Sequence, residues 1–514
     1  MSFARGSLNF RPSVNEPAAS SGKRERRVVF FLCLLAAAHV FVFSAAFPFF
    51  NVVDEQVHFD LAVRYSQGDL PRSLTPPCAE ALPFIAVFGT VEYLWPPATQ
   101  PGGRIAPPPW TLPISVIAGN LRAKEDLWRE QVKNHEASQP PLYYGLAGAW
   151  WRLGKLLGLD GGRLLYWLRF LNIPLLAALV WLGWVAAKKV FPENIFIRLA
   201  VPALIAFMPQ STFYAINNDI LSPLTFGLAF VLLLKFGEAE LPSPGLAAAV
   251  GLALAAAFLT KISTLPLLAV AGLFIALKIF RLLRAGNLRP SLPALGCLAA
   301  CAGLPAAAWM ARCRVVFGDF TGSVLKIQFL GWTHKPLGEW FHHPLFTGAG
   351  FWYFLKGNLA TFWQGEILWQ RRPLALAPVD SVYLVLTLGA FAFALAAWLR
   401  RPSPFAAPQR AAVGLAFSCL AAALAFFALL SVEYDFQDCF YPSREHPFFV
   451  SGRLMLGLLV PFLILFACGL DRLLKNFQGA TRFFVLGALL AFMLASEITI
   501  DWSIFPNAYN WFHL

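Results

Sequence analysis

The chain has 514 residues, of which 58% are apolar and only 13% are charged, and its mean hydropathy is +0.60. These proportions exclude a disordered protein and most soluble domains, in which about a quarter of the residues are charged. The net charge of +13 does not indicate a nucleic-acid partner, because the basic residues fall in short clusters between apolar runs, as in the cytoplasmic loops of membrane proteins. We therefore expect an all-α polytopic membrane protein that binds no nucleic acid.

The chain opens with a polar, basic segment, residues 1–27, which we expect to be a cytoplasmic tail. The apolar run at 28–50 is long enough to cross a bilayer and too long for the core of a cleaved signal peptide. Further apolar runs bring the predicted transmembrane helices to about eleven, within one domain that covers 28–499. These runs lie at about 163–187, 195–213, 219–236, 244–260, 262–284, 291–311, 379–399, 410–431, 453–473 and 482–499.

Three long loops, 49–162, 312–378 and 432–452, are predicted to share one side of the membrane, and the stretch 141–158 decides which side. If this moderately apolar stretch crossed the membrane, four basic clusters would lie outside, against the positive-inside rule: Lys188-Lys189, Arg281–Arg284, Arg400-Arg401 and Asp471–Lys475. We therefore expect it to lie flat, as a juxtamembrane helix at the outer interface. The N-terminus is then cytoplasmic, and the loops and the C-terminal tail, 500–514, face outward, as expected for a bacterial inner-membrane protein.

The first outer loop opens with Asp54-Glu55-Gln-Val-His58, just beyond the first helix. On a helix, Asp54 and His58 lie on one face at positions i and i+4, with Glu55 beside them. A single histidine does not make the HExxH pattern of a zinc protease. Acidic residues at the membrane edge are costly unless they are hydrated or used. We interpret the motif as a set of catalytic carboxylates, the alternative being an ordinary hydrated helix start.

Three further motifs are expected at the same outer level. The segment SQPPLYY, which holds Gln139 and Tyr143, opens the flat helix, although proline is also an ordinary start signal for a helix. Asn218 and Asp219 lie between two spans, where they also suit a helix cap. Lys261 lies between two apolar runs, where its one structural reading is snorkelling to the interface.

Two motifs lie in the later outer loops. Trp363 and Glu366 belong to the segment TFWQGE, in which tryptophan beside polar groups suits sugar stacking, although aromatic stripes more often serve packing. Arg444 and Arg453 are cations on the outer side that suit phosphate binding, and the alternative is anchoring to lipid head groups.

The order of these motifs resembles the GT-C superfamily of integral-membrane glycosyltransferases, over about residues 28–475. Within it, the segments DEQVH at 54–58, TFW at 361–363 and SGR at 451–453 look most like a branch of uncharacterised bacterial membrane proteins. The resemblance implies a polyprenyl-phosphate-linked sugar as donor and a lipid, glycan or protein of the cell envelope as acceptor. It also implies that Asp54 is the base of an inverting displacement.

Other motif residues take their expected roles from the same resemblance and from the chemistry of phosphate displacement. Glu55 and His58 would support the base or help to hold a divalent cation. A leaving phosphate needs nearby cations, which the outer lysine and arginines supply. The predicted donor-binding residues are Lys261, Arg444, Arg453, Gln139, Tyr143, Asn218 and Asp219, and the predicted acceptor-binding residues are Trp363 and Glu366.

Two other classes of function stay open. A lipid or glycan transporter or flippase would need charged or helix-breaking residues at mid-span and repeat symmetry, whereas the charged residues here cluster at the outer ends of the spans. A non-catalytic assembly subunit would keep the same fold and motifs. The sequence also leaves open the sugar, the acceptor, the metal dependence, and whether Cys78 and Cys439 of the outer loops form a disulfide.

Overall fold

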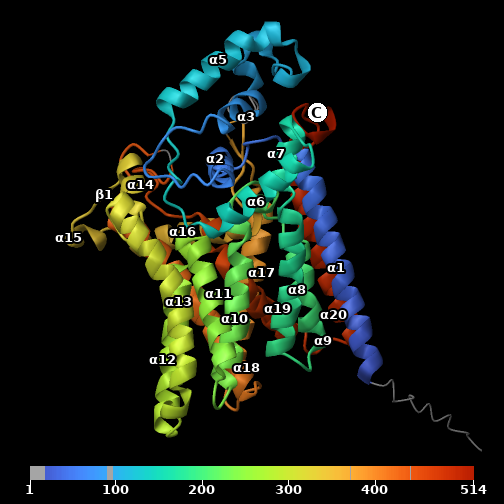
Figure 1. Ribbon diagram of the computed structural model, residues 1–514. Coiled ribbons are helices and arrows are strands. Elements are labelled where there is room, and N and C mark those ends of the chain that lie inside the picture. The colour runs from blue at the N-terminus through green and yellow to red at the C-terminus, as the bar shows by residue number, and fades with distance from the viewer. Residues whose placement is uncertain (1–17, 90–95, 371, 440) are drawn as a thin grey trace, which may run out of the picture.

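The computed structural model describes residues 18–89, 96–370, 372–439 and 441–514 (Figure 1). Residues 1–17 of the predicted cytoplasmic tail lie outside the described part. The remainder of that tail is helical, because the first helix, α1, spans Ala18–Ala46 and so begins well before the predicted apolar run.

Nine helical stretches in the described part of the chain are long and apolar enough to cross a membrane. This finding confirms the predicted all-α polytopic fold. Besides α1, the helices of these stretches are α8 (Asn172–Val190, continuing α7), α10 (Ser222–Glu238), α12 (Leu265–Arg284), α13 (Leu288–Phe317), α17 (Ala377–Leu399), α18 (Ala407–Glu433), α19 (Leu459–Leu473) and α20 (Gly479–Asp501).

The two remaining predicted spans form shorter apolar helices, α9 (Ile195–Ala206) and α11 (Pro244–Thr260). At 1.5 Å per residue, α9 is about 18 Å long, well short of a hydrocarbon core of about 30 Å. After α9 the chain continues through two short 3-10 helices, η4 (Ser211–Tyr214) and η5 (Asn218–Ile220), whose residues are buried. Irregular backbone next to a membrane is tolerated where protein covers it. This buried stretch carries Asp219 into the interior.

The polar loops gather at one end of the bundle, the upper end in Figure 1. The helices of this end are α2 (Glu55–Ser66), α3 (Ala81–Phe88), α5 (Ile114–Gln131), α6 (Leu142–Leu156), α7 (Gly161–Arg169), α14 (Ser323–Phe329), α15 (Leu337–Trp340) and α16 (Gly348–Gln364). Besides η4 and η5, the 3-10 helices of the described chain are η1 (Pro97–Thr99), η2 (Pro101–Gly103), η3 (Pro109–Thr111), η6 (Ile262–Thr264), η7 (Pro344–Phe346), η8 (Gly452–Leu458) and η9 (Trp511–His513).

Backbone pairing joins the three long loops to one another. Strand β1 (Thr333–His334) pairs antiparallel with β4 (Tyr434–Asp435), and so links the second loop to the third. An isolated bridge between Val52 and Ile367 links the first loop to the second. Strands β2 (Leu368–Trp369) and β3 (Arg372–Pro373) form a local hairpin.

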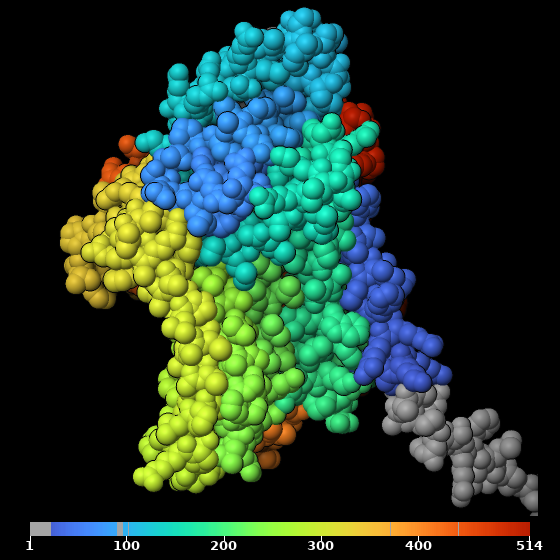
Figure 2. All heavy atoms as spheres, viewed as in Figure 1, coloured from blue at the N-terminus to red at the C-terminus, as the bar shows by residue number. Residues whose placement is uncertain are grey.

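Side-chain contacts extend this association to the C-terminal tail. The indole nitrogen of Trp110 donates to the carbonyl of His513 at 2.9 Å, and the hydroxyl of Tyr509 donates to the carbonyl of Ala106 at 2.6 Å. Figure 2 shows the first loop covering the upper end of the bundle beside the segment that contains α14. The loops and tail predicted to face outward therefore share one end of the molecule.

Helix α6 covers most of the stretch that was predicted to lie flat. It has 15 residues and is not among the candidate spans, and in Figure 1 it runs across the upper end of the bundle. A Cβ atom at Gly148 would lie 2.7 Å from the backbone nitrogen of Ser66, so α6 packs closely on α2. Leu146 and Leu153 on the opposite face are 39% and 41% exposed. An amphipathic helix of this length suits the interface rather than a crossing.

Helix α19 is the central helix of the bundle, and almost all of its residues are buried. It makes close contact with α17, where a Cβ atom at Gly469 would lie 1.8 Å from the carbonyl oxygen of Ala390. Such small residues let membrane helices approach closely. Because η8 leads directly into α19, a side chain on η8 is anchored to a helix that is almost entirely buried.

Candidate functional site

A single buried arginine gathers three carboxylates at the upper end of the bundle. The guanidinium of Arg453, on η8, donates from Nε to Glu366 at 2.8 Å, from Nη1 to Asp219 at 3.0 Å and from Nη2 to Asp54 at 3.4 Å. Only 8% of the Arg453 side chain is exposed. The three carboxylates come from loops far apart in the chain, and all four residues were predicted to belong to the site.

Close backbone packing fixes the position of Arg453. A Cβ atom at Gly452 would lie 2.0 Å from the carbonyl oxygen of Asn358 on α16, so only glycine fits at this position. The Gly452 amide donates to the hydroxyl of Thr361 at 2.7 Å, and that hydroxyl donates to the carbonyl of Val450, also at 2.7 Å. The hydroxyl of Ser451 donates to Glu366. The two motifs predicted in the later loops therefore lie against each other.

Asp219 and Lys261 form a buried ion pair beside Arg453. Lys261 does not snorkel, because it ends α11 and only 7% of its side chain is exposed. The helix cap that was considered for this segment is supplied by Asn217, whose side chain accepts from the Asp219 amide at 2.8 Å. The Asp219 carboxylate is thereby left for the two cations.

Asn218 and Gln139, two further predicted residues, lie beside the Asp219–Lys261 ion pair. The Nδ2 atom of Asn218 donates to the carbonyl of Thr260 at 3.2 Å and to the side chain of Gln139 at 3.3 Å. The Oδ1 atom of Asn218 is buried and has no hydrogen-bond partner in the described structure. Gln139, Asn218, Asp219 and Lys261 are therefore brought together, as predicted.

Asp54 precedes α2 and has a left-handed backbone, with φ of 65°. Aspartate and asparagine tolerate this conformation better than most residues. Its side chain forms no cap hydrogen bond with α2, whereas an ordinary helix start would use the side chain in this way. Instead, one carboxylate oxygen lies 3.2 Å from Nε2 of His135 and the other contacts Arg453. The side chain is 24% exposed, so it borders accessible space.

The surroundings of Asp54 keep its carboxylate ionised. Burial alone would raise its pKa, but the hydrogen bond and charge of His135, together with the charges of Arg453 and Lys326, hold the pKa well below its usual range. A carboxylate with a lowered pKa is charged at neutral pH and can accept a proton.

Glu55 has a different role from its neighbour. Its fully buried carboxylate accepts from Nε and Nη2 of Arg169, each at 2.7 Å, and from the amides of Phe50 at 2.8 Å and Ile216 at 3.1 Å. All of its strong acceptor positions are thus used by protein groups. The structure therefore places Glu55 where it ties α1, α2, α7 and the segment before Asp219 together, and not where it is free to act on a substrate.

His58 lies beside the cluster in a buried position. Its Nδ1 atom is 2.7 Å from the hydroxyl of Tyr144, and the residue is 2% exposed. Burial lowers the pKa of His58 to about 4, so the imidazole is neutral at pH 7. A neutral His58 can orient the loop, but the structure does not place it against Asp54 as a direct partner.

A histidine and a glutamate missed by the sequence interpretation complete the cluster. Asp54, His135 and Glu136 each offer a ligand atom within 4.8 Å of the others. One oxygen of Glu136 pairs with Lys326 of α14, and the other is buried and has no hydrogen-bond partner in the described structure. The signal was present in the sequence, because His135-Glu136 lies one residue before the SQPPLYY segment.

The composition of this group fits a divalent cation. Two carboxylates and an imidazole are ligands that transition metals accept, and Glu136 offers an unpartnered buried oxygen. The wider cluster holds four carboxylates, Asp54, Glu136, Asp219 and Glu366, against three permanent cations, Lys261, Lys326 and Arg453. With His135 neutral, as a metal ligand must be, the cluster has one more negative than positive charge, so an added cation would be favourable there.

Three predicted residues do not reach an open part of the site. Arg444 is exposed and forms an ion pair with Asp435 at 3.2 Å, at the surface and away from the buried cluster. Trp363 is 1% exposed, stacks on Tyr383 at 5.2 Å between ring centroids and is covered by core aromatics, which contradicts the predicted sugar contact. Tyr143 is fully buried in the core rather than at an open donor site. In each case the sequence motif showed the type of the residue but not which side chains surround it in the fold.

Cys78 and Cys439 are both free thiols, so the disulfide left open by the sequence is not formed.

The fold and the ion cluster thus define a polytopic membrane protein with a charged site at one end of its helical bundle. The chain belongs to the DUF2142 family of predicted membrane proteins, whose family model matches residues 37–317, more than half of its length. The matched region includes Asp54, His135, Asp219 and Lys261 and ends before Glu366 and Arg453. No curated protein matches the chain.

Proposed function

We propose that this protein is an inverting glycosyltransferase of the GT-C type. It moves a sugar from a polyprenyl-phosphate donor to a cell-envelope acceptor at the outer face of a bacterial inner membrane. One observation carries the proposal: the buried guanidinium of Arg453 holds Asp54, Asp219 and Glu366 together where the three long loops meet. A structural role alone does not call for such a concentration of charge, since buried ion pairs are costly to desolvate.

Asp54 is the proposed base. It is ionised, partly exposed and set directly before α2, so that its carboxylate can reach an acceptor hydroxyl. Proton removal by a positioned carboxylate typically contributes about 10²- to 10⁴-fold to a rate. Until a cation binds, the hydrogen bond from Nε2 of His135 fixes the orientation of this carboxylate.

Arg453 and Lys261 are proposed to stabilise the departing phosphate. Both are buried beside Asp219, and both would act in a site from which water is largely excluded. Preorganised charges are most effective where negative charge develops during a reaction. Asp219 and Glu366 would hold the two cations in place before the donor arrives.

Asp54, His135 and Glu136 would hold a divalent cation, which would supply positive charge next to the donor phosphate. His135 and Glu136 would keep their present backbone positions, because Asn134 anchors this segment through its amide to Asp60 at 2.7 Å.

A flippase or transporter is the second candidate, and one observation favours it. His39 of α1 and Glu497 of α20 form a buried pair inside the bundle, 2.7 Å from Nε2 to Oε2, and Tyr214 donates to the same glutamate. Ionisable residues inside membrane spans often mark a pathway. A flippase would move a lipid-linked sugar between leaflets without consuming it.

The experiment is an assay of the purified full-length protein in proteoliposomes with a panel of polyprenyl-phosphate sugars. We expect release of free polyprenyl phosphate from one donor, with an acceptor from a membrane extract. Asp54→Asn should lower release about 10²-fold or more, and Asp435→Asn, which removes a half-buried carboxylate outside the cluster, should not. Movement of intact donor between leaflets, without release, would support the flippase instead.

A further inference from the structure

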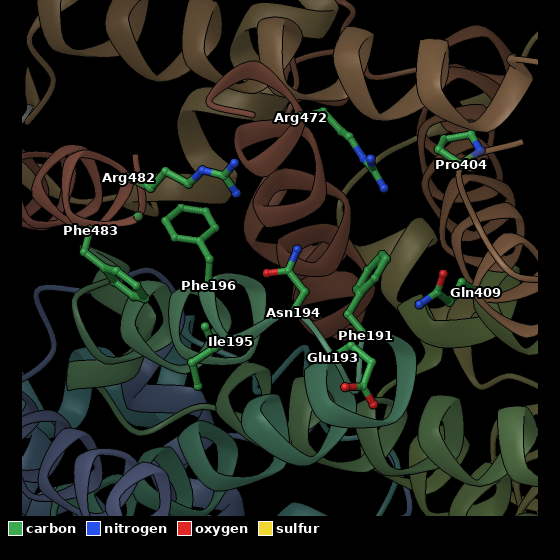
Figure 3. A pocket seen from close by; sticks show the side chains of 11 residues that line it. Phe191, Glu193, Asn194, Ile195, Phe196, Pro404, Gln409, Arg472, Arg482 and Phe483 are labelled. Atoms are coloured by element: carbon green, nitrogen blue, oxygen red, sulfur yellow. The ribbon is translucent and has the colours of Figure 1, made fainter. Parts of the chain in front are cut away.

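A second candidate site lies at the end of the bundle opposite the ion cluster. Three connections, α8–α9, α17–α18 and α19–α20, meet there around a pocket of about 480 Å³ (Figure 3). The pocket mixes apolar side chains with two arginines and shares no residue with the predicted outer site. Its lining residues are Phe191, Glu193, Asn194, Ile195, Phe196, Pro404, Gln409, Arg472, Gly479, Arg482 and Phe483.

We propose that this pocket binds the phosphate of an anionic lipid head group. Arg472, in the last turn of α19, is the main ligand. Its guanidinium lies 4.9 Å above the ring of Phe405, its Nε atom is buried without a hydrogen-bond partner, and it forms no ion pair with the described residues. Figure 3 shows the group pointing into the pocket. A planar guanidinium can bind phosphate through two parallel hydrogen bonds.

Arg482 frames the other side of the pocket. Its Nη1 atom donates to Asp471 at 3.1 Å and its Nη2 atom to the carbonyl of Lys475 at 2.7 Å. These contacts brace the α19–α20 turn, so the wall that carries Arg472 is held in place. Arg482 is thus a fixed positive charge rather than a free ligand.

Two helix N-termini add further donors. Helix α20 begins at Gly479, which lines the pocket, and no side chain caps its first amides. Helix α9 begins at Ile195 beside the same pocket, and its cap, Asn194, accepts from the Ile197 amide at 3.1 Å. Free amides at a helix start attract anions. They reinforce the cation that Arg472 supplies.

The rim of the pocket favours a lipid over a soluble phosphate. Ile195 and Phe483 are 40% and 38% exposed at the pocket, where they can contact acyl chains. Apolar surface beside cationic groups matches an amphipathic ligand. Glu193 is the one acidic residue of the lining, and Figure 3 shows its carboxylate directed away from both guanidinium groups.

The test is native mass spectrometry of the full-length protein, titrated with phosphatidylglycerol or with phosphatidylcholine, and in a third arm with glycerol 3-phosphate as competitor. We expect phosphatidylglycerol to bind more tightly than phosphatidylcholine. Arg472→Gln should weaken phosphatidylglycerol binding by about 10-fold or more, the scale of a lost charge-assisted hydrogen bond. Arg289→Gln, which changes an exposed arginine in the first turn of α13, is the matched control and should bind normally.

Glu193→Gln is a second variant whose expected result cannot arise from misfolding. Removing this exposed negative charge should tighten phosphatidylglycerol binding about two- to five-fold. Normal binding by a monodisperse Arg472→Gln protein, or no preference between the two lipids, would overturn the proposal. Displacement by glycerol 3-phosphate would support the phosphate site and overturn the lipid as its source.

Discussion

Exchanging Asp54 and Glu55 for their amides should separate chemistry from stability at two adjacent positions. Glu55→Gln removes a charge that the buried guanidinium of Arg169 contacts twice, and it places an amide NH₂ near donors that now point at a carboxylate oxygen. Breaking a buried pair in this way costs about 3–5 kcal/mol of folding free energy. Asp54→Asn keeps the left-handed backbone, which asparagine tolerates well.

We therefore expect Asp54→Asn to lose less stability than Glu55→Gln, because Asp54 is partly exposed and Arg453 keeps two other carboxylate partners. Its turnover should fall about 10²-fold or more, because the amide cannot accept the proton. Glu55→Gln should behave in the opposite way. It should lose much of its thermal stability while the surviving folded fraction keeps a near-native turnover.

The assay combines two measurements on each purified variant. One is the temperature at which half of the protein leaves the monodisperse peak on size exclusion after heating. The other is donor turnover in proteoliposomes, normalised to the folded protein. The reasoning would be refuted by an Asp54→Asn protein with full turnover, or by a Glu55→Gln protein as stable as the native chain.

Three further predictions concern the surroundings of the site. The pKa of His58 is about 6.5 in the unfolded chain and about 4 in the folded protein, so the unfolded state binds a proton first as the pH drops. The free energy of unfolding should therefore decline between pH 6.5 and 4, by up to about 3 kcal/mol. His58→Gln should flatten this part of a profile of melting temperature against pH, and an unchanged slope would contradict the prediction. Zinc or manganese should raise the melting temperature of the native protein, and Glu136→Gln should reduce that increase, whereas an equal increase in both would argue against a metal at this residue. Gly452→Ala should destabilise by about 1–3 kcal/mol, because its Cβ would meet backbone atoms, while Gly303→Ala, with open space around it, should have little effect on the melting temperature.

The sequence by itself determined the class of fold and most of the ion cluster. Apolar runs of sufficient length predict membrane helices because burying backbone in lipid requires them. Polar residues at the ends of such runs are few and costly, so each of them stands out. For this reason Asp54, Asp219, Lys261, Glu366 and Arg453 were recognised one by one, although nothing in the sequence showed that they meet.

Only the tertiary structure decided which of the candidate residues act together. Glu55 is next to Asp54 in the chain, but Arg169 turns it into a structural anchor. Arg444 and Arg453 are nine positions apart, yet one is exposed and the other is buried among three carboxylates. A local pattern reports the type and average exposure of a side chain, whereas its charge partners come from distant segments. The packing of the three loops onto η8 and α19 is what places those partners within hydrogen-bonding distance.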